Sequence, residues 1–385
     1  NSIFIRRAGG SLARRVDFTN ASPLDFSYNE AAAFAQDRWV LSPKLTLDYG
    51  LRFDRDGVTE NNNFAPRFSF LFLPLKNQRT IIRGGIGIFY DRSLATGGLF
   101  ADGETPDDEL NPTTGFKQIP RRIVTDFAAD GVSVIGVPHH LRNRIAAPLR
   151  TPRSVRYSLQ LDRGITKDLT MRVGFLERFT KNDLLVEPII NGDAGTLLLS
   201  SRGRSRYDEL QFLLAYNKEK FGQINASYVL SRVRGDLNTA DKIFGDTPAP
   251  LAEANEYGRL PFDAPQRFLL YGTFDVSKKY DVRLAPLFEA RSGFPFSAVN
   301  ERLDFVGARN QAGRFPMYLS LDVQVTKGIQ LPFFKDKRAR VGIALFNLTN
   351  HFNPRDVQMN LTSPNYGKFY NSLGTSVKAK FDIGF

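Results

Sequence analysis

The chain has 385 residues, 42% of them hydrophobic, and a formal net charge of +12. No stretch approaches the ~18 consecutive apolar residues that a membrane-spanning helix requires, so helical membrane spans are excluded. The absence of Cys excludes a disulfide framework and a cysteine metal site. Lys and Arg are spread over alternating positions and turns without a dense basic cluster, which argues against a nucleic-acid partner.

The first 30 residues have the least clear pattern. We expect one short strand at residues 2–7, followed by an external loop that reaches residue 30. The chain begins at Asn1 without Met and without a signal segment, which is typical of a processed chain or an excised piece.

From residue 31 onwards, apolar and polar residues alternate with a period of two. In the segment 44–54, the residues of one face are all apolar or aromatic: Leu45, Leu47, Tyr49, Leu51 and Phe53. Comparable segments occur at residues 155–162, 169–175, 210–216, 224–230, 268–276, 282–290, 319–325, 341–345 and 373–385. The alternation predicts about thirteen or fourteen strands, many of them close to the ~9–11 residues that a tilted strand needs to cross a bilayer. We therefore predict an all-β fold, an antiparallel transmembrane β-barrel of the outer-membrane type.

The predicted connections alternate between short and long. Short ones fall at residues 42–43, 74–78, 164–167, 217–220, 277–279 and 328–337, and long ones at residues 92–151, 182–205, 234–265, 292–315 and 350–372. Bacterial outer-membrane barrels have short periplasmic turns and long extracellular loops, so we expect the long connections to lie outside the cell. Pro286 lies within a predicted strand, where it removes a ladder hydrogen bond, and we expect a bulge or local irregularity there.

Several segments resemble one family of outer-membrane proteins. They are residues 33–39 (AFAQDRW), 45–53 (LTLDYGLRF), 63–67 (NFAPR), 83–91 (RGGIGIFYD), 265–268 (PQRF), 346–353 (FNLTNHFN) and 380–385 (KFDIGF). Together they look like the barrel of TonB-dependent receptors, in particular the Oar-like group. The resemblance implies a barrel of about 22 strands filled by an N-terminal plug. Residues 31–385 are then the C-terminal portion of that barrel, residues 1–30 an external loop with a partial strand, and the plug is absent from this chain.

By this resemblance, the expected function is TonB-energised uptake of a scarce or bulky nutrient, such as a siderophore, a glycan or a peptide. Two alternatives stay open: a passive porin-like or structural outer-membrane barrel, and a soluble all-β carbohydrate-binding protein. The expected partners are outer-membrane lipid and lipopolysaccharide, the small-molecule, glycan or peptide ligand, and TonB through the missing N-terminal region. The terminal strand resembles the signal that the barrel-assembly machinery reads, with Val377, Phe381, Ile383 and Phe385 on one face.

No catalytic set, metal site or cofactor site rises above chance in the sequence. His139 and His140 are adjacent and so point to opposite faces of a strand, while His351 lies in another loop. Residues 84–87 (GGIG) resemble a nucleotide-binding glycine run only superficially, because the following residues continue a strand. The acidic segment 102–109 offers oxygen ligands for calcium but lacks the spacing of an EF-hand loop, so a solvated loop is favoured.

Ligand binding is expected in the long external connections, because loops held by a rigid scaffold commonly carry function. Residues 92–151 are the leading candidate, supported by residues 202–207, 236–259 and 294–315. No motif singles out individual substrate-binding residues.

Overall fold

The computed structural model describes residues 2–18, 28–91, 122–146, 148–192, 194–219, 222–239, 253–330 and 338–383. In these ranges the regular secondary structure is entirely β-strand. No helix in the described ranges is long and apolar enough to span a membrane.

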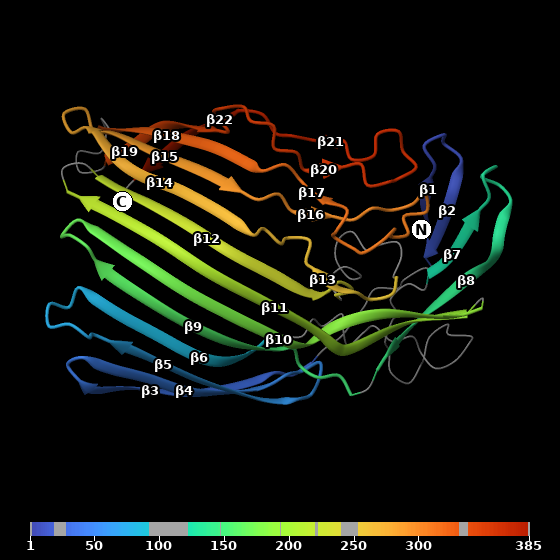
Figure 1. Ribbon diagram of the computed structural model, residues 1–385, viewed down its shortest axis with the longest axis horizontal. Helices are drawn as coiled ribbons and strands as arrows, with labels where there is room; N and C mark the ends of the chain where they lie inside the picture. The colour runs from blue at the N-terminus through green and yellow to red at the C-terminus, as the bar shows by residue number, and fades with distance from the viewer. Residues whose placement is uncertain are drawn as a thin grey trace.

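Thirteen strands form one antiparallel sheet, the main sheet, in which each strand pairs with its neighbours in chain order (Figure 1). In order they are β3 (Ala31–Ser42), β4 (Leu45–Arg55), β5 (Asn62–Phe72), β6 (Thr80–Tyr90), β9 (Arg153–Gly164), β10 (Leu169–Asn191), β11 (Ala194–Lys218), β12 (Gly222–Asp236), β14 (Gln266–Ser277), β15 (Val282–Arg291), β18 (Tyr318–Gln330), β19 (Arg338–Phe346) and β22 (Ser376–Ile383). Among the described strands, β3 and β22 are the two edges of this sheet. The predicted all-β antiparallel architecture is confirmed, and the main sheet has the predicted number of strands, while the described chain has nine further short or outlying strands, of which only the one at Ser2–Arg6 was predicted separately.

The two faces of the main sheet differ in chemistry. One, the apolar face, carries exposed large apolar side chains: Tyr49, Leu51, Phe68, Ile86, Leu159, Leu161, Phe175, Phe212, Leu214, Leu230, Ile343, Val377 and Phe381. The other, the polar face, is crosslinked by charged side chains. There the Asp162 carboxylate accepts a hydrogen bond from Arg172 at 2.6 Å and lies 3.2 Å from the Arg83 guanidinium. An apolar face toward lipid and a polar face toward a lumen are the pattern of an outer-membrane barrel wall.

The glycine run at residues 84–87 is part of β6 and serves packing. Gly84 pairs with Phe70 across the β5–β6 ladder, and a Cβ on Gly84 would lie 2.4 Å from Cε1 of the Phe70 ring. Only glycine leaves room for the aromatic ring to lie across the neighbouring strand. The structure therefore gives this run a role in the barrel wall.

Beyond the long-connection end of the main sheet lies a second set of strands, the outer sheet (Figure 1). It contains β1 (Ser2–Arg6), β2 (Leu12–Phe18), β7 (Arg122–Phe127) and β8 (Val134–Ile145), which pair in that order. Strand β8 joins it to the main sheet, because it pairs in parallel with residues 194–199 of β11. Its core consists of buried aliphatic side chains: Val16, Val124, Leu141, Leu149, Leu184, Val186, Leu197 and Leu199.

The outer sheet corrects two expectations. Residues 182–205 were predicted as a long loop, which is wrong: β10 and β11 continue through them as one long hairpin. The apolar runs 184–186 and 197–199 hide the alternation, because part of each is buried in the core of the outer sheet. The short strand expected at residues 2–7 is present as β1, but the predicted loop after it contains the further strand β2.

Pro286 produces the expected local irregularity. In the β14–β15 ladder, Tyr271 pairs with Leu287 and Phe274 pairs with Leu284, so the rungs between them are open on this side. The register does not change there, and the register shift of this ladder lies between Asp275 and Ser277. On the other side, Pro286 pairs in register with β18.

The two faces predict opposite responses to a new charge. We expect Phe212→Arg to destabilise the barrel in lipid by about 2–4 kcal/mol, because it places a cation on the apolar face. Gln211→Arg adds the same charge at the neighbouring position on the polar face, beside the open space at Gly174, and we expect a change of less than about 1 kcal/mol. Urea unfolding of the full-length protein in vesicles measures both. Equal losses in the two variants would contradict the assignment of faces.

Asp183 predicts a pH dependence at the long-connection end of the wall, where it lies between two register shifts in β10. Burial raises the pKa of this carboxyl to about 6, against a hydrogen bond from Ser205, and the carboxylates of Asp91 and Asp236 raise it further. Because the folded-state pKa lies above the unfolded value of about 3.9, ionisation destabilises the fold progressively as pH rises through this interval.

We therefore expect Asp183→Asn to raise the unfolding temperature relative to the wild type at pH 7.5 and to leave it nearly unchanged at pH 4. Circular dichroism melts of the full-length protein at the two pH values measure the difference. The same shift at both pH values would show that the carboxyl is ionised throughout.

Candidate functional site

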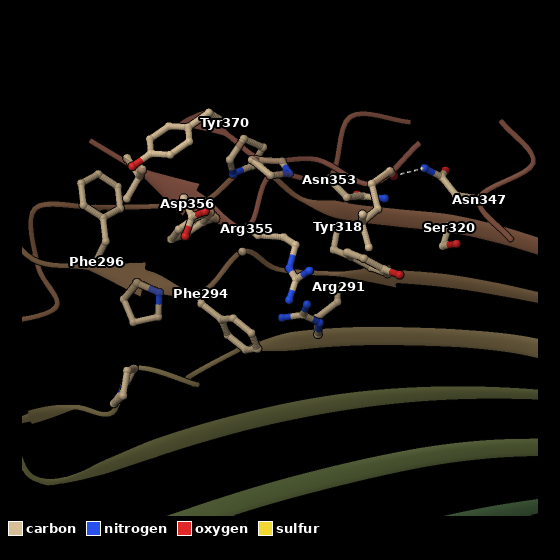
Figure 2. A pocket seen from close by; sticks show the side chains of 18 of the residues that line it. Arg291, Phe294, Phe296, Tyr318, Ser320, Asn347, Asn353, Arg355, Asp356 and Tyr370 are labelled. Atoms are coloured by element: carbon tan, nitrogen blue, oxygen red, sulfur yellow. Dashed lines mark hydrogen bonds between the residues drawn. The ribbon is translucent and has the colours of Figure 1, made fainter. Parts of the chain in front are cut away.

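A cavity of about 990 Å³ opens on the polar face at the long-connection end of the main sheet (Figure 2). Two folded connections form it together with the ends of β15, β18, β19 and β22. The first connection, residues 292–317, contains the paired strands β16 (Pro295–Phe296) and β17 (Gly313–Arg314). The second, residues 347–375, contains the paired strands β20 (Asp356–Val357) and β21 (Phe369–Tyr370). The cavity is therefore built by folded segments on a rigid wall.

The second connection is fixed to the wall by asparagine side chains. The Asn347 side chain donates to the carbonyl oxygens of His351 and Leu373, and its own carbonyl oxygen accepts from the His351 N–H. The Asn353 amide bonds both the N–H and the carbonyl oxygen of Leu319 on β18, at 3.0 and 2.7 Å. The segment at residues 346–353 that resembles a family motif thus works as the clamp that places one wall of the cavity.

Phe296 and Phe315 belong to the apolar wall of the cavity, and Phe369 packs against both of them. The ring of Phe296 lies 6.1 Å from that of Phe315 and 6.0 Å from that of Phe369, in edge-to-face geometry. The rings of Phe315 and Phe369 are 5.3 Å apart. Because these rings come from both connections, they also hold the two connections together.

Arg291 is the central cation of the cavity. Its guanidinium lies over the rings of Phe294 and Tyr318, at 4.0 and 5.2 Å from their centroids. The Glu289 carboxylate is 3.8 Å away but is bound more closely by Arg267, at 2.8 Å. One terminal nitrogen of Arg291 is buried and has no hydrogen-bond partner among the described residues. Arg291 lines the cavity and 20% of its side-chain surface is exposed, so a ligand can contact this cation there.

A second cation faces the same space. Figure 2 shows the side chain of Arg355 directed toward Arg291. The acidic side chains of the cavity are already engaged, because Asp322 accepts from Ser320 and from the backbone of Asn347, and Asp356 accepts from Asn371. Two guanidiniums beside aromatic rings suit a ligand that joins an oxyanion to a flat apolar part.

The histidines are not brought together. His139 on β8 contacts the carbonyl oxygen of Gly192 through Nδ1, at 2.9 Å, and His351 contacts Asn353. Within the described ranges, no group of three or more His, Asp or Glu side chains is arranged to hold a metal ion. The acidic segment 102–109 lies outside the described residues.

The stretches predicted to bind ligand fall in different places. Residues 294–315 line the cavity, whereas residues 202–207 and 236–259 do not border it where they are described. Of the leading candidate, residues 92–121 and 147 lie outside the described residues, and its strands β7 and β8 belong to the outer sheet. The connection at 347–375 was recognised as long but not proposed for binding. The asparagine-rich segment 346–353 was the available signal.

Ion pairs tie the cavity to the outer sheet. The Arg14 guanidinium of β2 lies 2.5 Å from the carboxylate of Asp126 on β7 and 2.5 Å from that of Asp304 in the first connection. Arg302 of the same connection lies 3.5 Å from Asp126. Burial of Asp304 acts to raise its pKa, but hydrogen bonds from Asn300 and Arg14 outweigh this effect and lower the pKa. The outer sheet thus holds the connection that lines the cavity.

Comparison with known proteins defines the class of this fold. A family model described as an outer membrane beta barrel domain matches residues 55–197. A comparison with curated protein sequences finds no match. Among solved structures, the chain is similar to the outer membrane transporter YddB from Escherichia coli, with 12% identity, 99% of this chain and 48% of that chain covered, and a TM-score of 0.63.

Two further solved structures give the same result. The ferric-catecholate import receptor Fiu from Escherichia coli K12 shows 10% identity, with 97% of this chain and 46% of that chain covered and a TM-score of 0.56. A variant of the ferric enterobactin receptor PfeA from Pseudomonas aeruginosa shows 14% identity, 96% and 44% coverage, and a TM-score of 0.58. The chain spans less than half the length of these transporters. It has the fold of an outer-membrane β-barrel and is a protein of the bacterial outer membrane.

The ion pairs of Arg14 predict how firmly the first connection is held. We expect Arg14→Gln to raise the rate of trypsin cleavage after Arg302 roughly tenfold in the full-length protein, because it leaves two carboxylates without their shared partner. Arg15→Gln is the matched control, since Arg15 lies next on β2 and, among the described residues, forms an ion pair only with Asp17, at 2.8 Å. Equal cleavage rates in the two variants would contradict the tether.

Proposed function

We propose that the chain is the C-terminal part of the barrel of a TonB-dependent receptor that takes up a scarce nutrient. The observation that carries the proposal is the match in architecture. Nearly the whole chain aligns with less than half of several outer-membrane transporters, and its cavity lies at the long-connection end of the polar face, the end that outer-membrane barrels turn to the outside of the cell. Transporters of this class have a lumen closed by a plug, so a binding cavity at the outer mouth is where a ligand would be captured before the plug moves.

A larger barrel than the described sheet supports the same proposal. Strand β3 is exposed along all 12 of its residues. An open row of backbone N–H and C=O groups does not persist against lipid, so β3 and β22 require pairing partners in the membrane. In a barrel of about 22 strands, further strands of the same protein would supply them, and TonB would act through a plug region that precedes Asn1.

The exposed apolar side chains of the C-terminal strand are suited to recognition by the barrel-assembly machinery. Val377 and Phe381 on β22 are exposed on the apolar face, with 63% and 58% of their surface accessible. Ile383 ends the strand, and Phe385 lies outside the described residues. We propose that these four residues form the assembly signal, because an exposed apolar edge strand is suited to pairing with another sheet.

The chemistry of the cavity supports an acidic, partly flat ligand. Fiu and PfeA are named for ferric-catecholate import and for ferric enterobactin, both of which belong to this kind of chemistry. Arg291 and Arg355 would bind the acidic groups, and Phe294, Phe296 and Tyr318 would contact the flat part. A siderophore-like nutrient therefore fits the cavity better than a neutral glycan, which would supply no anion for Arg291 and Arg355.

The test uses the source bacterium and the full-length protein. We expect deletion of its gene and deletion of TonB to abolish the uptake of the same compound from a panel of radiolabelled ferric siderophores. Arg291→Gln should lower that uptake about tenfold, because a charge-assisted hydrogen bond is lost. Arg283→Gln, which removes a charge from the same face of β15 and breaks a 3.0 Å ion pair with Asp275, is the control.

Passive transport is the competing outcome. If the purified full-length protein lets small sugars equilibrate across vesicle membranes, and uptake persists without TonB, the barrel is a porin-like channel and the receptor proposal fails.

A further inference from the structure

A dense group of basic residues lies on the apolar face at its extracellular end. These residues, the basic patch, come from four neighbouring strands: Lys181 on β10, Arg204 and Arg206 on β11, Arg232 and Arg234 on β12, and Arg259 on β13 (Tyr257–Arg259). All six side chains are exposed. They are far apart in the sequence and are assembled only by the pairing of the strands.

Strand register makes the patch continuous. Arg234 pairs with Arg206 on one side and with Arg259 on the other, so three cations stand in one row. Lys181 pairs with Arg204, and Arg232 lies two residues from Arg234 on the same face. Like charges placed directly opposite one another destabilise a sheet, so this arrangement lowers the stability of the fold unless an anion is bound.

The nearby carboxylates neutralise the patch only in part. Glu177 and Asp208 both pair with Arg206, at 2.5 and 3.0 Å. The buried Asp236 accepts hydrogen bonds from the backbone N–H of Arg204 and from Asn255. In the described part of the chain, no other ion pair is formed by the patch.

The position of the patch along the strands indicates its depth in the membrane. Phe179 pairs with Arg206 and so lies level with the patch, and its ring meets that of Tyr157, two residues lower on the wall, edge-to-face at 6.3 Å. Phe175 and Phe212 of the apolar face lie below them. An aromatic girdle marks the boundary between hydrocarbon and headgroups, so the patch stands at the depth of the outer-leaflet headgroups. Arg206, Arg232 and Arg234 also line a hollow of about 220 Å³, together with Tyr257 and with Asp208, whose carboxylate is paired with Arg206.

We propose that this patch is a binding site for the phosphate groups of lipopolysaccharide. The guanidiniums of Arg206, Arg232 and Arg234 bind a lipid A phosphate in the hollow, and its acyl chains lie along the apolar face below. Arginine suits this role because its planar fork gives two parallel hydrogen bonds to a phosphate. The site is on the opposite face of the wall from the ligand cavity, so it does not depend on the transport proposal.

The test measures binding of fluorescent diphosphoryl lipid A to the detergent-solubilised full-length protein by thermophoresis. We expect the double variant Arg232→Gln/Arg234→Gln to bind roughly ten to thirty times more weakly than the wild type, because each basic residue near an anionic lipid surface adds a similar increment. The loss should shrink at high salt, since exposed charges are screened.

The matched control is Arg156→Gln/Arg178→Gln. These two arginines pair with each other on β9 and β10 at a similar height but on the polar face, so the control removes the same net charge from the other side of the wall. An equal loss of binding in both double variants would overturn the proposal.

Two further arms distinguish the source of the phosphate. Lipid A stripped of its phosphates should bind as weakly to the wild type as intact lipid A binds to the test variant. Inorganic phosphate should compete only at far higher concentration, because it lacks the acyl chains. Unchanged binding of the stripped lipid, or equal affinity for inorganic phosphate, would overturn the assignment to lipopolysaccharide.

Discussion

The lipid bilayer imposes one requirement on which the rest of this structure depends: every backbone N–H and C=O group in the membrane needs a partner within the protein. The antiparallel ladders of the main sheet meet that requirement between β3 and β22 in the described chain. Once the backbone is paired in this way, the side chains alternate between two faces, and each face can take its own chemistry. Asp162 and its arginines lie on one face and Phe212 lies on the other because of this geometry.

The same geometry determines what could be predicted from the sequence. Alternation in segments such as 44–54 identified the strands. The lengths of the connections predicted which end of the sheet carries the long segments. Both are local properties of the chain. The hairpin at residues 182–205 escaped prediction because its apolar runs are packed against β2, β7 and β8, which come from distant parts of the sequence. Contacts of that kind, like those of Arg14 with Asp126 and Asp304, carry no local signal.

The candidate site was predictable only in outline. Long external connections were expected to bind ligand, and residues 294–315 do line the cavity. The role of Arg291 depends on Phe294, on Tyr318 and on the competition of Arg267 for Glu289, which only the folded wall brings together. The motif at 346–353 was visible in the sequence, but its function as a clamp depends on hydrogen bonds to Leu319 and Leu373, on other segments.

The distribution of positive charge follows from the two faces as well. The sequence shows a net charge of +12 without a dense basic cluster, yet register gathers Arg206, Arg234 and Arg259 into one row on the outside of the wall. At a similar height on the inside, Arg156 and Arg178 face the lumen. A period of two sends neighbouring residues to opposite sides, so one stretch of strand can supply cations to both faces of the wall at once. A charge pattern that is diffuse along the chain therefore becomes two separate basic surfaces in the folded wall.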